Sequence, residues 1–159
     1  MTIVELVKDY FKTEGWLFSQ VEDKNVFLFG INGENGKFQC LADIFDEEKF
    51  FSFYSICGFN TPESKKQEMA ELITRLNYEE AFGNFEMDFE DGEIRYKTSI
   101  FYESLEPTTQ FVKNIIIQNI MSMDDSLPAL TGLAFQNMTP IDAFKLVEEI
   151  ETKKENKTL

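Results

Sequence analysis

Two neighbouring segments of this chain alternate as β-strands do, and the short charged turn between them sets how they pair. The segments are 37–45 and 50–57, and Asp-Glu-Glu-Lys at 46–49 separates them. If these four residues form the loop, the numbers of facing residues sum to 95. One face of this hairpin then holds Phe38, Cys40, Ala42 and Ile44 with Phe51, Phe53, Ser55 and Cys57.

The second face of the same hairpin is also partly apolar. Its apolar residues are Leu41, Phe45, Phe50, Tyr54 and Ile56. A sheet that buries only one face should alternate cleanly between apolar and polar side chains. Exposed apolar patches of more than a few hundred Å² usually mark interaction sites. The pattern therefore predicts that this second face is covered by a second copy of the chain, by a partner segment, or by the helices from Thr139 onward.

The remaining patterns define the fold class. Helical spacing of apolar residues predicts helices that begin at Thr2, Thr61, Pro107 and Thr139, with Pro128 kinking or ending the third. Alternation predicts further strands over 16–22, 26–31, 82–89 and 93–103. This order is typical of an α+β fold with an antiparallel sheet. We expect a single domain over residues 1–150, followed by a charged, frayed tail at 151–159.

Asp91-Gly92 is the strongest hairpin signal in the chain. As a two-residue turn it gives facing residues whose numbers sum to 183, with an apolar face that begins at Phe89 and Ile94. The other face then pairs opposite charges, Asp88 with Arg95 and Glu86 with Lys97. Because exposed cross-strand charge pairs stabilise a sheet, we expect these four residues to form structural ion pairs rather than a ligand site.

The charge composition excludes several function classes. Fifteen basic residues against 29 acidic ones give a net charge of −14, and the chain has no histidine. Catalysis by a Ser-His-Asp or Cys-His pair and imidazole metal sites are therefore excluded. Two cysteines cannot complete a structural zinc site. The scattered basic residues form no stripe that would bind nucleic acid, and the acidity disfavours anionic membranes.

No catalytic, cofactor-binding or metal-binding residues are predicted. The segment around Gly36-Lys37 lacks the spacing of a P-loop, and residues 88–93 lack that of a calcium loop. Asp124 and Asp125 are adjacent, so they point apart on a helix. Because the sequence shows neither a secretory signal nor a membrane span, we expect a cytoplasmic protein with reduced thiols at Cys40 and Cys57.

Several segments resemble the YbjN family. They are FYS at 53–55, LITRLNY at 72–78, FGNFEMDFEDGEIRYKTSI at 82–100 and NIMSMDDSLPAL at 119–130. The resemblance implies a two-layer fold like that of type III secretion chaperones, with helices packed on one side of a twisted antiparallel sheet. It also implies a bacterial sensory transduction regulator without agreed catalytic residues, and its likeness to secretion chaperones implies acidic, dimeric, partner-binding proteins.

These observations favour a non-enzymatic, protein-binding regulator or chaperone-like module that forms a homodimer. Its partner would be a basic or extended segment, held by strand addition or in apolar pockets. The alternative is a small-molecule sensor with a pocket between helices and sheet. A buried pocket lined by unpaired polar groups would favour the sensor, and a flat apolar patch would favour the protein-binding module. An enzyme that uses carboxylates or bound magnesium is a third possibility.

Overall fold

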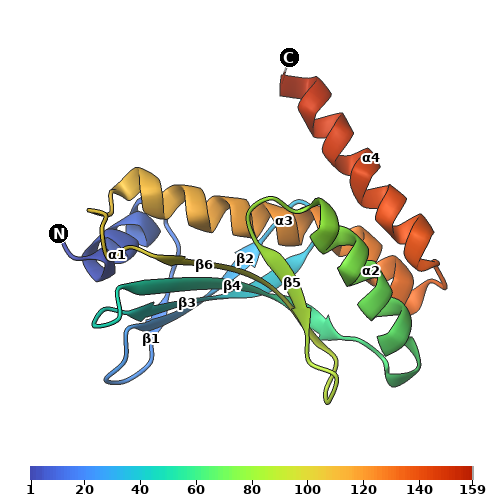
Figure 1. Ribbon diagram of the computed structural model, residues 1–159, viewed down its shortest axis with the longest axis horizontal. Coiled ribbons are helices and arrows are strands. Elements are labelled where there is room, and N and C mark those ends of the chain that lie inside the picture. Colours follow the sequence, from blue (N-terminus) through green and yellow to red (C-terminus); the bar gives the residue numbers. More distant parts are fainter. Residues whose placement is uncertain (159) are drawn as a thin grey trace.

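Helices cover one face of an antiparallel sheet and leave the other face open (Figure 1). The structure is a computed structural model that describes residues 1–158. Across the sheet, the strands are β1 (Ser19–Gln20), β2 (Val26–Asn32), β3 (Lys37–Phe45), β4 (Phe50–Asn60), β6 (Glu93–Phe101) and β5 (Asn84–Met87). The helices are α1 (Ile3–Thr13), α2 (Lys66–Glu79), α3 (Thr109–Phe135) and α4 (Pro140–Thr158). The predicted α+β class with an antiparallel sheet is confirmed.

The first helix begins and ends where its sequence indicates. The Thr2 hydroxyl accepts a hydrogen bond from the Glu5 amide, and the Glu5 carboxylate accepts one from the Thr2 amide. This reciprocal pair satisfies two amides that the first turn would otherwise leave free. Gly15, just after the helix, has a φ of 72°, which a residue without a side chain adopts at little cost.

The core lies between the sheet and the layer formed by α1 and α3. Large aromatic residues from the middle strands fill it, among them Phe27, Phe51, Phe53 and Tyr96. One buried polar side chain crosses this layer. The Asn119 amide on α3 donates to the carbonyls of Phe53 and Tyr96 at 2.9 and 3.2 Å, and so ties α3 to β4 and β6.

The register of the β3–β4 hairpin agrees with the prediction. Cys40 faces Ser55 and Phe45 faces Phe50, so the numbers of facing residues sum to 95. The loop is Asp46 to Lys49, as expected. Every residue predicted for the inward face is buried, including Ser55, whose hydroxyl lies 3.6 Å from the Cys40 sulfur.

The register of the β5–β6 hairpin differs from the prediction by two residues. Phe85 faces Tyr96 and Glu86 faces Arg95. The turn holds four residues, 89–92, because the Glu93 carbonyl accepts from the Asp88 amide. Gly92 takes a φ of 80°, and the Thr61 amide donates to its carbonyl at 2.8 Å. The turn is therefore shaped by a contact with distant Thr61, which the local Asp91-Gly92 signal does not contain.

Four other expectations are corrected. The predicted strand at 16–22 shrinks to β1, because Trp16 and Phe18 pack against Phe11 of α1. Thr61 caps no helix; a 3-10 turn at Glu63–Lys65 precedes α2. The helix α3 continues through Pro128 to Phe135. Residues 151–158 are helical rather than frayed, and Leu159 lies outside the described residues.

Candidate protein-binding face

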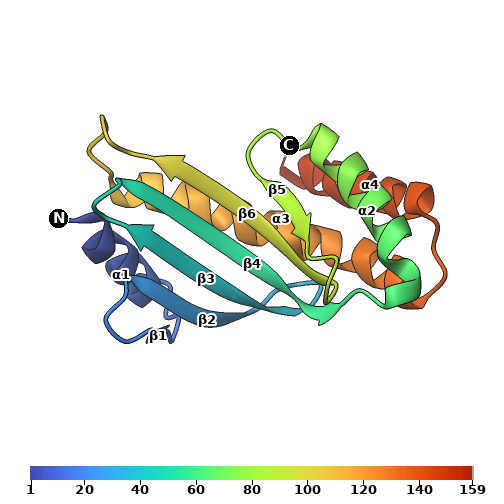
Figure 2. The ribbon, with the colours of Figure 1, turned by 60° about the horizontal axis from the view of Figure 1, so that its bottom comes forward.

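The face of the sheet that points away from α1 and α3, called the open face below, carries the apolar residues predicted for it. Neither α4 nor any other helix covers this face, since α4 packs on α2 and α3 and then projects away from the sheet (Figure 2). Leu41, Phe50, Tyr54 and Ile56 are half-buried and Phe45 is 41% exposed. Folding of the C-terminal helices over this face, one of the three sequence-based possibilities, is therefore wrong.

Three phenylalanines cross the open face in a row at one end. Phe45, Phe50 and Phe101 face one another on β3, β4 and β6. The ring centroids of Phe45 and Phe50 are 5.8 Å apart, and those of Phe50 and Phe101 are 4.7 Å apart. These three residues are called the Phe row below. Phe101 is 68% exposed, so the row presents aromatic surface to solvent.

Sequence analysis missed Phe101 because its partner strand is not its neighbour in the chain. The pairing of β4 with β6 skips α2 and β5, and no turn sets that register. Leu28 on β2 was missed for a related reason. It faces Leu41 and extends the apolar surface toward the edge of the sheet.

The opposite end of the open face is charged but internally neutralised. Glu86 accepts from Arg95 at 2.7 Å and also pairs with Lys97. The predicted contact between Glu86 and Lys97 is present, but Asp88 does not pair with Arg95, because the shifted register places Glu86 there. The Arg95 guanidinium also lies 4.8 Å from the centre of the Tyr54 ring, a cation–π contact. Burial alone would raise the pKa of Glu86, but the hydrogen bonds from Lys97 and Arg95 lower it below its ordinary value.

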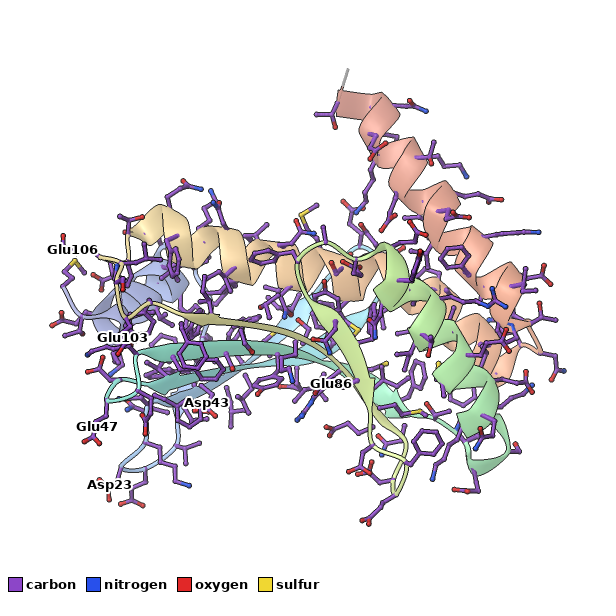
Figure 3. All side chains as sticks on the ribbon, in the orientation of Figure 1. Asp23, Asp43, Glu47, Glu86, Glu103 and Glu106 are labelled. Carbon is purple, nitrogen blue, oxygen red and sulfur yellow. The ribbon has the colours of Figure 1, made fainter. Side chains whose placement is uncertain are left out.

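Carboxylates surround the end of the sheet where the Phe row lies. Figure 3 shows Asp23, Asp43, Glu47 and Glu103 at this end, and these four residues are called the acidic rim below. Asp43 lies on the open face two residues before Phe45, and burial raises its pKa although Lys24 opposes the shift. The other three come from the turns after β1 and β3 and from the loop after β6, and each is exposed.

The edge of the sheet at β5 is closed to strand addition. The side chain of Asn77 on α2 accepts from the Phe85 amide at 2.7 Å and donates to the Phe85 carbonyl at 3.0 Å. It therefore occupies both backbone groups that an added strand would use at this residue. Strand addition at β5 is disfavoured, and the side chains of the open face remain as the means of recognition.

The two adjacent aspartates of α3 have structural partners on different elements. The Asp124 carboxylate accepts from the backbone amides of Glu34 and Asn35, at 2.9 and 3.0 Å, and so fixes the loop between β2 and β3. Asp125 pairs with Lys154 of α4. The two side chains point to different elements, as predicted, and this division of contacts does not form a catalytic pair.

The groups that could carry covalent or metal chemistry are buried or scattered. Burial raises the pKa of the Cys40 thiol to about 12 and also raises that of Cys57, so neither forms a reactive thiolate. Within residues 1–158, no three acidic, cysteine or histidine side chains are placed to hold a metal ion. The absence of a metal and of a cofactor stays a prediction.

No cleft among those described here has the features expected of a sensor pocket. The buried polar atoms without a hydrogen-bond partner are the Tyr10 hydroxyl, the Thr61 hydroxyl and Asn119 Oδ1. They lie on separate elements, and none lines the clefts found on residues 1–158. The sensor alternative therefore gains no support from a shared cavity.

The fold and the uncovered sheet place this chain among α+β proteins in which helices cover one face of an open antiparallel sheet. Residues 4–131 match the YbjN family, described as "putative bacterial sensory transduction regulator", and the chain belongs to that family. The fold is also that of a solved structure from E. coli, described as "YbjN, a putative transcription regulator". The two share 12% sequence identity with a TM-score of 0.60, over 84% of this chain and 93% of that one.

Two further comparisons were negative. No curated protein matches this chain. Over the described residues, no helix is both long enough and apolar enough to cross a membrane.

Proposed function

We propose that this protein is a non-enzymatic regulator that acts by binding another protein on the open face of its sheet. The observation that supports the proposal is the Phe row, which presents aromatic surface at the end of an uncovered sheet. Aromatic side chains are enriched at protein interfaces, and exposed apolar surface of this kind is otherwise a liability for a soluble chain. A sensory or stress role in the bacterial cytoplasm follows from the family description.

The charge distribution favours a protein partner over DNA for such a regulator. The E. coli relative is described as a transcription regulator, which allows direct binding of DNA or action through another protein. Direct binding needs a cationic surface that displaces counterions from phosphates. On the open face, Arg95 and Lys97 are the cations, and Glu86 pairs with both. With a net charge of −14, the chain lacks the means to hold a duplex.

A photo-crosslinking amino acid on the open face tests this function. Placed at Tyr54, it should form covalent adducts with a specific protein when the chain is expressed in its native cell. The matched control is the same amino acid at Tyr78, which is 88% exposed on α2 and remote from the open face. Specific adducts at Tyr54 alone support the proposal, whereas no adducts at Tyr54, or the same adducts at both positions, contradict it.

A further inference from the structure

We propose that the Phe row and the acidic rim together form a docking site for a basic segment of a partner protein, one that carries apolar residues flanked by arginine or lysine. This inference rests on the proposed function and names the chemistry of the partner. It commits to a cationic partner rather than a second copy of the chain.

Charge complementarity is the first argument for a cationic partner. The loops at this end of the sheet hold Asp23, Asp43, Asp46, Glu47, Glu48, Glu103 and Glu106. Lys24 and Lys49 lie in the same loops, and Lys49 pairs with Asp46. The excess of carboxylates attracts cations and raises the rate at which they are captured.

The arrangement of apolar and charged groups is the second argument. Phe45 and Phe101 are each followed, two residues later, by an exposed carboxylate, Glu47 and Glu103. Asp43 lies on the same face, two residues before Phe45. The site is therefore an aromatic floor bordered by carboxylates. Such a floor takes apolar side chains or the flat face of a guanidinium, while the border takes the flanking charges.

Self-repulsion argues against a second copy of this chain on the same site. Each copy has a net charge of −14, so face-to-face packing would bring two strongly acidic chains together. The Arg95 and Lys97 cations of a second copy are already neutralised by its own Glu86. A partner with uncommitted cations meets no such opposition.

Fluorescence anisotropy with labelled peptides tests the chemistry. The probe has three arginines, then leucine, phenylalanine and leucine, then three arginines. One control peptide replaces the central residues with three serines, and the other replaces every arginine with glutamate. The probe should bind at least tenfold more tightly than either control, and its affinity should fall as salt is added. Equal binding of the serine peptide or of the glutamate peptide would overturn the inference.

Variants locate the site. Phe101→Ser should weaken probe binding at least fivefold, and Phe89→Ser should leave it unchanged, since Phe89 is 51% exposed in the β5–β6 turn outside the Phe row. Phe45→Ser provides a second test if Phe101→Ser fails to fold. Equal loss in a folded Phe row variant and in Phe89→Ser, or no loss in the Phe row variant, would overturn the assignment.

A second pair of variants separates position from net charge. Glu47→Gln with Glu103→Gln should weaken binding several-fold. The control, Glu90→Gln with Glu155→Gln, removes the same charge from exposed positions elsewhere and should have little effect. Equal losses would show that net charge alone attracts the probe and would overturn the inference. Failure of the probe alongside specific adducts at Tyr54 would reject the basic segment but leave the proposed function intact.

Discussion

At the scale of single residues, Asp124 connects the two ends of the family match. Its carboxylate holds the amides of Glu34 and Asn35, and a side chain added at Gly33 would overlap it. Asp124→Asn keeps the shape but offers one acceptor to two amides. Because a hydrogen bond to a charged group is worth about 1.5–3 kcal/mol, we expect a loss of unfolding free energy of that order in urea denaturation.

The same contact can be tested from the loop side. Gly33→Ala should displace the loop and lose much of what Asp124→Asn loses. The double variant should therefore cost clearly less than the sum of the single variants. Fully additive losses would show that the two residues do not act through one contact.

Glu86 is the residue whose ionisation should matter most on the open face. Its pKa is lowered in the folded state, so its contribution to stability is present above the ordinary carboxyl value and is lost as the pH falls through the lowered value. Glu86→Gln should cost less than about 1 kcal/mol at pH 7, because the pair is partly exposed. The difference in unfolding free energy between the variant and the native chain should vanish in acid. A difference that persists at pH 2 would contradict the ion-pair role.

At the scale of elements, the sequence predicts contacts between neighbours better than contacts between distant segments. The β3–β4 register followed from the length of the turn and from the alternation of apolar residues on both sides. The β5–β6 register was wrong by two because the contact of Gly92 with Thr61 selects a longer turn. A shift of two keeps each side chain on its predicted face, so the burial of Phe85 and Ile94 survived the error.

The cover of the open face could not be derived from the strands themselves. The pattern of Leu41, Tyr54 and Ile56 is equally compatible with burial by a helix and with binding by a partner. The direction of α4 decides between these two, and it depends on contacts such as that of Lys154 with Asp125. Those two residues are far apart in sequence, and no local signal joins them.

The outer half of α4 is held against like charge. Burial raises the pKa of Glu151, and the nearby carboxylates Glu80 and Asp125 raise it further. A raised carboxyl pKa favours the protonated folded state, so the repulsion is absent at acid pH and develops as the pH rises through the ordinary and then the raised value. Glu151→Gln should therefore slow amide hydrogen exchange in residues 151–158 at pH 7.

Two variants of the same helix serve as controls for that measurement. Glu149→Gln removes an exposed carboxylate that does not contribute to the shift, and it should leave exchange unchanged. Lys154→Ala removes the ion pair with Asp125 and should speed exchange. Equal slowing by Glu149→Gln and Glu151→Gln would mean that the effect is general charge reduction.

At the scale of the whole molecule, the two faces of the sheet differ in purpose, and one substitution on each face shows it. Tyr54 is half-buried on the open face beside Arg95, so Tyr54→Glu leaves the new carboxylate close to solvent and to a cation. Tyr96 is fully buried against the helices, so Tyr96→Glu buries an unpaired charge. We expect the first variant to keep its thermal transition within a few degrees of the native chain and the second to unfold.

The same Tyr54→Glu variant decides what occupies the open face in solution. The homodimer expected from the sequence remains a prediction, and light scattering after size exclusion measures it directly. A basic partner on this face requires that any dimer persist in Tyr54→Glu, because its contact then lies elsewhere, while binding of the arginine-rich probe falls. A dimer that dissociates in this variant would instead show that a second copy covers the face. That outcome would contradict the basic segment, because the self-repulsion of two acidic chains would then be outweighed by the apolar contact of their open faces.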